Sequence, residues 1–142
     1  MHNLRIRRLC GILGGMGEPE IDANGLDAVR TCLDAAAGLS PVDALAHLRE
    51  AADRLTDLLD ETMAAAVLTG QASLRAAGAR AGLTENAVGP RLARTRRLAA
   101  YADERGRVTA AGVERAKYDH ESGTPRPAPA TTAMRFKPRR ST

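Results

Sequence analysis

The stretch from Pro41 to Thr69 repeats with the period of one amphipathic helix, and this feature limits the possible folds most strongly. Its apolar and small residues recur at alternating spacings of three and four, which is the pattern of a single helical face. The residues of this seam are Leu45, Leu48, Ala52, Leu55, Leu59, Thr62 and Ala66. Ser40 is a good helix cap and Pro41 a good first helical residue. The sequence therefore predicts a long helix over about 41–69.

The rest of the composition favours helices as well. The 142 residues are 44% hydrophobic, mostly alanine and leucine, and no alternating run reaches strand length. A helix is also predicted over 22–37, which Gly38 ends; its apolar side consists of Leu26, Val29, Cys32 and Leu33. We expect an all-α fold, a small helical domain. Its parts are a basic segment with a glycine-rich linker over 1–20, an acidic helical part over 21–70, a basic helical part over 71–118 and a disordered basic tail over 119–142.

The seam of the long helix has two interpretations. It resembles a coiled-coil stripe that could pair with its copy in a homodimer, with Leu45, Leu48, Leu55 and Leu59 at the interface. Alternatively, the same stripe, widened by Leu58 and Met63, covers the core under the part that follows. The opposite face is acidic and is expected to be mostly solvated, with ion-pair spacing between Arg49 and Asp53 and between Glu50 and Arg54. The residues of this acidic face are Arg49, Glu50, Asp53, Asp57, Asp60 and Glu61.

The charges are divided unevenly between the two halves of the chain. Residues 16–70 contain eleven acids and three bases, a net charge of −8, whereas residues 71–142 contain fifteen bases and six acids, a net charge of +9. Basic side chains that neutralise phosphates release counterions, so the second half is expected to contact nucleic acid. Only Tyr101, Tyr118 and Phe136 are aromatic. This scarcity leaves few platforms for stacking single-stranded bases and favours double-stranded DNA.

Residues 74–101 have the layout of two short helices joined by a tight turn. Such helices cross closely only when the contact residues are small. A glycine can take the left-handed conformation after the first helix, an aliphatic residue can fill the space between the helices, and a threonine can cap the second. The residues in these roles are Ala77, Gly78 and Ala81 at the crossing, Gly82, Leu83 and Thr84 in the turn, and Val88 and Leu92 facing inward.

This pattern, followed by Arg94, Arg96 and Arg97, resembles the helix-turn-helix of sigma-factor region 4 and of small helix-turn-helix regulators from high-GC bacteria. The similarity covers about a fifth of the chain. It implies that residues 84–97 are similar to a recognition helix, whose outward side chains meet base edges in the major groove. We therefore expect a sequence-specific DNA-binding protein that acts as a transcriptional regulator.

Gly89 and Pro90 depart from the family pattern, because both residues disfavour a helix interior. Two backbone conformations can accommodate both residues. In the first, residues 85–89 form a short irregular turn and Pro90 is the first residue of the second helix; in the second, a single helix is kinked at this point. We favour the first, which leaves Arg91, Arg94 and Arg97 on one face at spacings of three. The candidate DNA contacts are Asn86, Arg91, Arg94 and Arg97 near the bases and Arg75, Thr84 and Arg96 at the phosphates.

The segments outside these helices are expected to play minor parts. Residues 104–108 are predicted to form a turn, followed by a helix that Thr109 caps, whose Arg115 and Lys117 could touch the DNA backbone. From about Ser122 the chain is rich in proline, alanine and threonine, and the tail either adds phosphate affinity or only solubilises the protein. Residues 1–12 could form a short basic helix.

We expect no enzyme activity, cofactor or metal site. His47, Glu50 and Asp53 lie at spacings of three and could in principle bind a metal, but an ordinary charged face explains them better. Cys10 and Cys32 lack the spacing of a metal or redox motif. Because the chain also shows no secretion signal and no membrane span, a cytoplasmic, nucleoid-associated protein with reduced thiols is predicted.

Two other functions compete with DNA reading by a regulator. The first is a helical protein–protein interaction module that binds a protein partner through the seam over 45–66 and has no specific DNA site. The second is a sigma-like role at promoters, which the lack of a preceding promoter-melting region and of aromatic residues disfavours.

Overall fold

The structure, a computed structural model, describes residues 20–124, 126 and 127. Within these residues every regular element is a helix. The elements are α1 (Ala23–Ala36), α2 (Pro41–Leu68), α3 (Leu74–Arg80), α4 (Glu85–Leu92), the 3₁₀ helix η1 (Ala99–Tyr101) and α5 (Ala110–Glu121). The predicted all-α fold is confirmed for this part of the chain.

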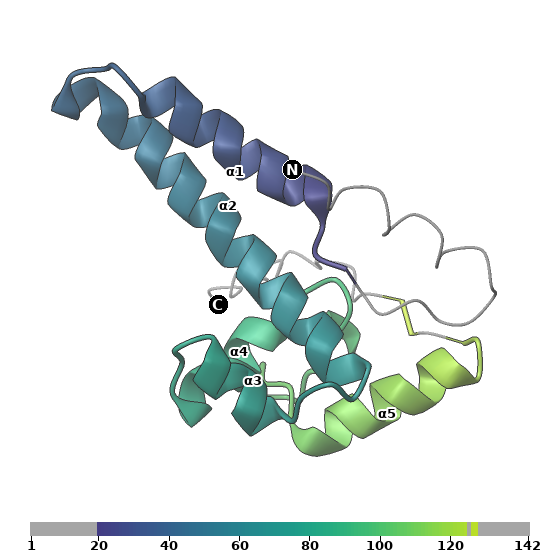
Figure 1. Cartoon of the computed structure of the whole chain (residues 1–142). Helices are drawn as coiled ribbons and strands as arrows, with labels where there is room; N and C mark the ends of the chain where they lie inside the picture. Colours follow the sequence, from purple (N-terminus) through teal and green to yellow (C-terminus); the bar gives the residue numbers. More distant parts are fainter. Residues whose placement is uncertain (1–19, 125, 128–142) are drawn as a thin grey trace, which may run out of the picture.

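Helices α1 and α2 form an antiparallel hairpin (Figure 1). The Asp22 carboxylate caps α1 by accepting a hydrogen bond from the Asn24 N–H at 3.0 Å. The Ser40 hydroxyl caps α2 in the same way through the Asp43 N–H at 3.3 Å, and Gly38 between the helices has a φ of +79°. The predicted helices over 22–37 and 41–69 are thus confirmed within one residue at each end. We call residues 23–59 of this hairpin the arm.

The main core lies at the C-terminal end of α2, where α3, α4, η1 and α5 pack around it (Figure 1). We call residues 60–121 the head. Leu92 and Leu98 have no exposed surface at all, and Val88 is buried as its inward spacing predicted. The other buried members of this core are Met63, Ala64, Val67, Ala77, Tyr101, Val108, Val113 and Ala116.

The leucines of the seam do not cover this core. Leu45, Leu48, Leu55 and Leu59 are 38–62% exposed. The residues of α2 that are buried in the arm are the small Ala44 and Ala51, and Ala51 forms a separate cluster with two residues of α1. The core-covering interpretation is therefore wrong for these four leucines, which lie in the arm, away from the head. Further along the same stripe, Met63 is buried in the main core, as that interpretation expected.

The last helix begins and ends close to the predicted positions. The Asp103 carboxylate holds the preceding turn by accepting hydrogen bonds from the N–H groups of Arg105 and Arg107, and the Thr109 hydroxyl caps α5 through the Gly112 N–H at 3.3 Å. Residues 119–121 belong to α5 rather than to the tail. The predicted basic helix over 1–12, its glycine-rich linker and nearly all of the predicted tail lie outside the described residues.

No helix in the described part of the chain has the length and the apolar character that crossing a membrane requires.

Candidate nucleic-acid interface

Helices α3 and α4 cross closely because one position at their contact has no side chain. A Cβ atom at Gly78 would run into the side chain of Val88. Gly82 has a φ of +72° in the turn between the helices, a conformation that glycine adopts without strain. The Leu83 N–H donates to the Gly78 carbonyl at 2.9 Å, which closes the end of α3. The two short helices and the tight turn expected from the sequence are confirmed.

The start of α4 is supported by charge more than by its cap. Thr84 occupies the cap position, but its side chain makes no capping hydrogen bond and is exposed. Glu85 follows in the first turn, where a carboxylate interacts favourably with the helix dipole. Its Oε1 atom lies 3.0 Å from Nε of Arg75, and both side chains are exposed. Arg75, a predicted phosphate contact, is therefore paired with an acid on the neighbouring helix.

Pro90 lies in the last turn of α4 and does not begin a helix. The favoured prediction, an irregular turn over 85–89 followed by a helix that starts at Pro90, is wrong, because one helix runs over Glu85–Leu92. Because the proline has no N–H, it cannot donate to the carbonyl four residues earlier, so α4 has one hydrogen bond fewer at this position. Gly89 is needed for a different reason, since a Cβ there would lie 3.1 Å from the Val108 carbonyl oxygen. The Val108 N–H donates to the Gly89 carbonyl at 3.1 Å.

Arg91 faces the long helix instead of solvent. Its Nη2 atom lies 2.7 Å from Oδ1 of Asp60, and the two side chains are only 22% and 9% exposed. This Asp60 oxygen accepts no hydrogen bond from any described residue, so the contact is an ion pair. The expected face of Arg91, Arg94 and Arg97 does not form, because α4 ends at Leu92. Asp60 is thus a buried exception on the face that was expected to be mostly solvated.

The other arginines of the motif lie on a turn that two buried residues hold in place. Thr95 is 1% exposed and Leu98 is fully buried. The Thr95 hydroxyl donates to the Leu92 carbonyl at 2.6 Å and accepts a hydrogen bond from the Leu98 N–H at 3.3 Å. Arg96 and Arg97, which lie between these anchors, and Arg94, which precedes them, are all exposed. We call residues 94–98 the arginine turn.

The long helix also holds the arginine turn. Oε1 of Glu61 accepts a hydrogen bond from the Arg96 backbone N–H at 2.7 Å. Asp60 and Glu61 thus anchor two neighbouring segments, α4 and the arginine turn. No sequence pattern indicates these roles of Asp60 and Glu61. The buried side of the arginine turn does have a signal, because Leu92, Thr95 and Leu98 follow one another at spacings of three.

The arginine turn is part of a wider set of free cations. Within residues 20–124, 126 and 127, no acid lies within ion-pair distance of the exposed guanidinium groups of Arg80, Arg94, Arg96, Arg97, Arg105, Arg107 and Arg115. By contrast, the three arginines of the arm all have acidic partners three or four residues away. The free positive charge therefore gathers on the head.

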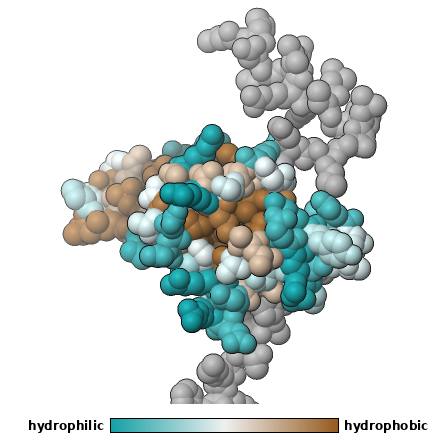
Figure 2. Space-filling view, turned by 90° about the horizontal axis from the view of Figure 1, so that it is seen from below, coloured by the Kyte–Doolittle hydropathy of each residue, from teal (hydrophilic) through white to brown (hydrophobic). Residues whose placement is uncertain are grey.

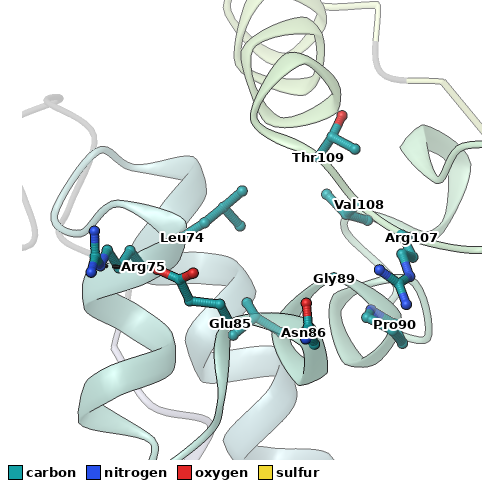
Figure 3. A pocket seen from close by; sticks show the side chains of 10 residues that line it. Leu74, Arg75, Glu85, Asn86, Gly89, Pro90, Arg107, Val108 and Thr109 are labelled. Atoms are coloured by element: carbon teal, nitrogen blue, oxygen red, sulfur yellow. Dashed lines mark ion pairs between the residues drawn. The ribbon is translucent and has the colours of Figure 1, made fainter.

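A cavity of about 280 Å³ opens between α3, α4 and residues 107–109. Leu74, Val88 and Val108 form its apolar lining. In Figure 3, Arg75 and Glu85 lie on one side of this cavity and Arg107 lies beside Pro90 on the other. Figure 2, seen from below, shows hydrophobic residues in the middle of the face and hydrophilic residues around them. This face therefore offers apolar contacts next to charged side chains.

Asn86 lies on the rim of this cavity, on the exposed side of α4. The predicted DNA contacts thus fall into two groups. Thr84 and Asn86 are exposed, and so are Arg94, Arg96 and Arg97, which have no ion-pair partner among the described residues. Arg75 and Arg91 are instead paired with acids.

In the described residues, no three His, Cys, Asp or Glu side chains come close enough together to hold a metal ion. Comparisons of the chain with protein-family models, with curated proteins and with solved structures found no match.

Proposed function

We propose that the protein binds double-stranded DNA through the head and acts as a transcriptional regulator. The observation that carries this proposal is the arginine turn. Three adjacent guanidinium groups without acidic partners in the described chain are held outward by Thr95, Leu98 and Glu61. The backbone that carries these cations is already fixed, so contact with phosphates orders only their side chains, and each neutralised phosphate releases counterions.

The position of the arginine turn after α4 supports a docking mode. Side chains on a short helix can enter the major groove while cations beside it bind the backbone. Asn86 is the exposed side chain of α4 best suited to reading a base, because an amide can form two hydrogen bonds with adenine. In this proposal Asn86 reads the sequence, and Arg94, Arg96 and Arg97 supply most of the affinity.

The test compares two triple variants that remove the same charge. The first replaces Arg94, Arg96 and Arg97 by alanine, and the matched control replaces the three paired arginines of the arm, Arg30, Arg49 and Arg54. Binding to random and genomic duplexes is measured by fluorescence anisotropy at two salt concentrations. The first variant should lose most of its affinity, and its slope of log K against log salt should fall by about 2–3, because about 0.9 counterion is released per phosphate contact.

Two outcomes would overturn the proposal. One is a wild-type protein that fails to bind duplex DNA at low salt. The other is an equal loss of affinity in both variants, which would mean that only the net charge matters. If binding is confirmed, selection from random duplexes with Asn86→Ala alongside tests sequence reading, and the variant should lose preference for its site by about 1–3 kcal/mol.

A second candidate function is binding to a protein partner without a specific DNA site. The observation that favours it is the exposure of Leu45, Leu48, Leu55 and Leu59. This function predicts that Leu55→Asp abolishes the interaction while the triple variant at 94, 96 and 97 retains it.

A further inference from the structure

The arm carries an apolar face that nothing covers among the described residues. Leu45, Leu48, Leu55 and Leu59 of α2 are 62%, 45%, 52% and 38% exposed. At spacings of three, seven and four along a continuous helix, these leucines lie on one side. Such a row of large exposed side chains differs from the single exposed leucines that are ordinary on protein surfaces.

Helix α1 extends this face. The pKa of Arg54 is raised mainly by the Glu50 carboxylate, with a smaller contribution from Cys32. Cys32 of α1 therefore lies near Arg54, on the charged side of α2. Val29 and Cys32 are the buried contacts of α1 with α2. Leu33, one residue further around α1, is turned toward the opposite side, where the seam lies, and it is 47% exposed.

The interior of the arm is too small to explain its length. Its buried cluster contains only Val29, Cys32 and Ala51, with Ala44 also buried nearby. Small residues therefore separate the two helices, while the large leucines lie outside. Amphipathic helices are stabilised mainly by packing of their apolar face, so the arm needs a further layer over the leucines.

From these observations we propose that a second copy of this chain supplies that layer, with two arms packed face to face as a four-helix bundle. From Leu45 to Leu59 the face is about 21 Å long at 1.5 Å per residue, and two helices 8–10 Å apart make it roughly 20 Å wide. The flat area of such a face is about 420 Å². Because the accessible surface of protruding side chains exceeds the flat area that they cover, the face approaches the ~800 Å² of accessible surface that each partner buries in a stable complex.

The charges around the face fit a second copy. Arg30 and Asp27 of α1 form an ion pair at 3.0 Å, and Arg49 and Asp53 of α2 form one at 3.2 Å. The acids Glu50 and Asp57 lie on the other side of α2, half a turn from the seam. Two identical faces can therefore meet without bringing uncompensated like charges together. A partner attracted by charge would bind the acidic side instead.

The proposed interface leaves the arginine turn free. Leu59 and Glu61 are two residues apart on α2, about 200° around the helix. The arginine turn, which Glu61 binds, thus lies on the side of α2 away from the leucines. A two-fold dimer would carry two such turns and would read an inverted repeat with half-sites about 34 Å apart; this consequence alone depends on the proposed function.

The experiment is sedimentation equilibrium of the full chain without DNA, from low to high micromolar concentration. Wild type should reach the mass of two chains. Leu55→Asp should return to the mass of one chain, with a dissociation constant raised at least about 100-fold, because it places a charge in the middle of the face. The matched control Ala46→Asp adds the same charge at an exposed position on the opposite side of α2 and should remain dimeric.

Circular dichroism of each variant shows whether the helices remain folded, and Leu48→Ala, a milder change on the same face, should weaken the dimer without unfolding the chain. A monomeric wild type would overturn the proposal and leave the face to another occupant. A dimer that tolerates Leu55→Asp as well as Ala46→Asp would also overturn it, because the interface would lie elsewhere. Both results are independent of DNA binding.

Discussion

The arm and the head use the same residue types in opposite ways. In the arm, alanines lie between the helices and leucines are exposed, whereas in the head Leu92 and Leu98 are fully buried and the exposed positions carry arginines. The arginines differ too: those of the arm are paired with acids nearby in the sequence, and most of those of the head have no acidic partner among the residues that the structure describes. One helix, α2, thus serves two environments, a thin hairpin and a packed core.

The largest expected effect comes from the same substitution made in both regions. Leu92→Ala should lower the free energy of unfolding by about 2–5 kcal/mol, since it removes a buried side chain and leaves a cavity. Leu48→Ala should change it by less than about 0.5 kcal/mol in dilute, monomeric protein, because Leu48 is half exposed. Urea unfolding followed by circular dichroism measures both. Equal losses would mean that the leucines of the arm are covered within one chain.

The ion pair between Asp60 and Arg91 should come next. Arg91→Met alone should cost about 3 kcal/mol, because it leaves a buried carboxylate without its partner. The double variant with Asp60→Leu should recover most of this loss, since an apolar pair removes the cost of desolvation. Urea unfolding of the two single variants and the double variant completes the cycle. Additive losses would contradict this view and show that the two groups do not interact.

The glycines of the two regions should respond differently to an added methyl group. Gly78→Ala should cost about 1–3 kcal/mol, because its Cβ meets the buried side chain of Val88. Gly25→Ala on α1 should stay within about 0.5 kcal/mol of wild type, since the gain in helix propensity offsets contacts with the ends of the Asp22 and Leu58 side chains at 3.1 Å. Thermal unfolding of both variants tests this, and a stable Gly78→Ala would disprove the close crossing.

The helix caps should give the smallest difference. Ser40→Ala should lower stability by about 1 kcal/mol, because the Ser40 hydroxyl accepts a hydrogen bond from the N–H of Asp43. Thr84→Ala should change stability by less than about 0.5 kcal/mol, since Thr84 makes no such bond. The measurement is urea unfolding under identical conditions. A larger loss at Thr84 would indicate that its hydroxyl does cap α4 in solution.

The sequence alone determined the local features of this protein. The long helix, its start at Ser40 and Pro41, the tight turn at Gly82 and the cap at Thr109 follow from periodicity and from the backbone preferences of single residues. These signals act over a few residues, so they can be recognised without knowing which helices pack against one another. The inward direction of Val88 and Leu92 follows for the same reason.

Only the tertiary structure decided which apolar residues are buried and which charged residues are paired or exposed. The seam has the same residue pattern whether it is buried or exposed, and its exposure depends on where along α2 the head packs. Pro90 lies inside α4 and does not begin a helix, and the residue before it, Gly89, is in close contact with Val108, nineteen residues later. Arg91 is withdrawn from the surface by Asp60, thirty-one residues earlier in the chain. Contacts between residues so far apart depend on the packing of several helices, and a pattern within one helix does not contain them.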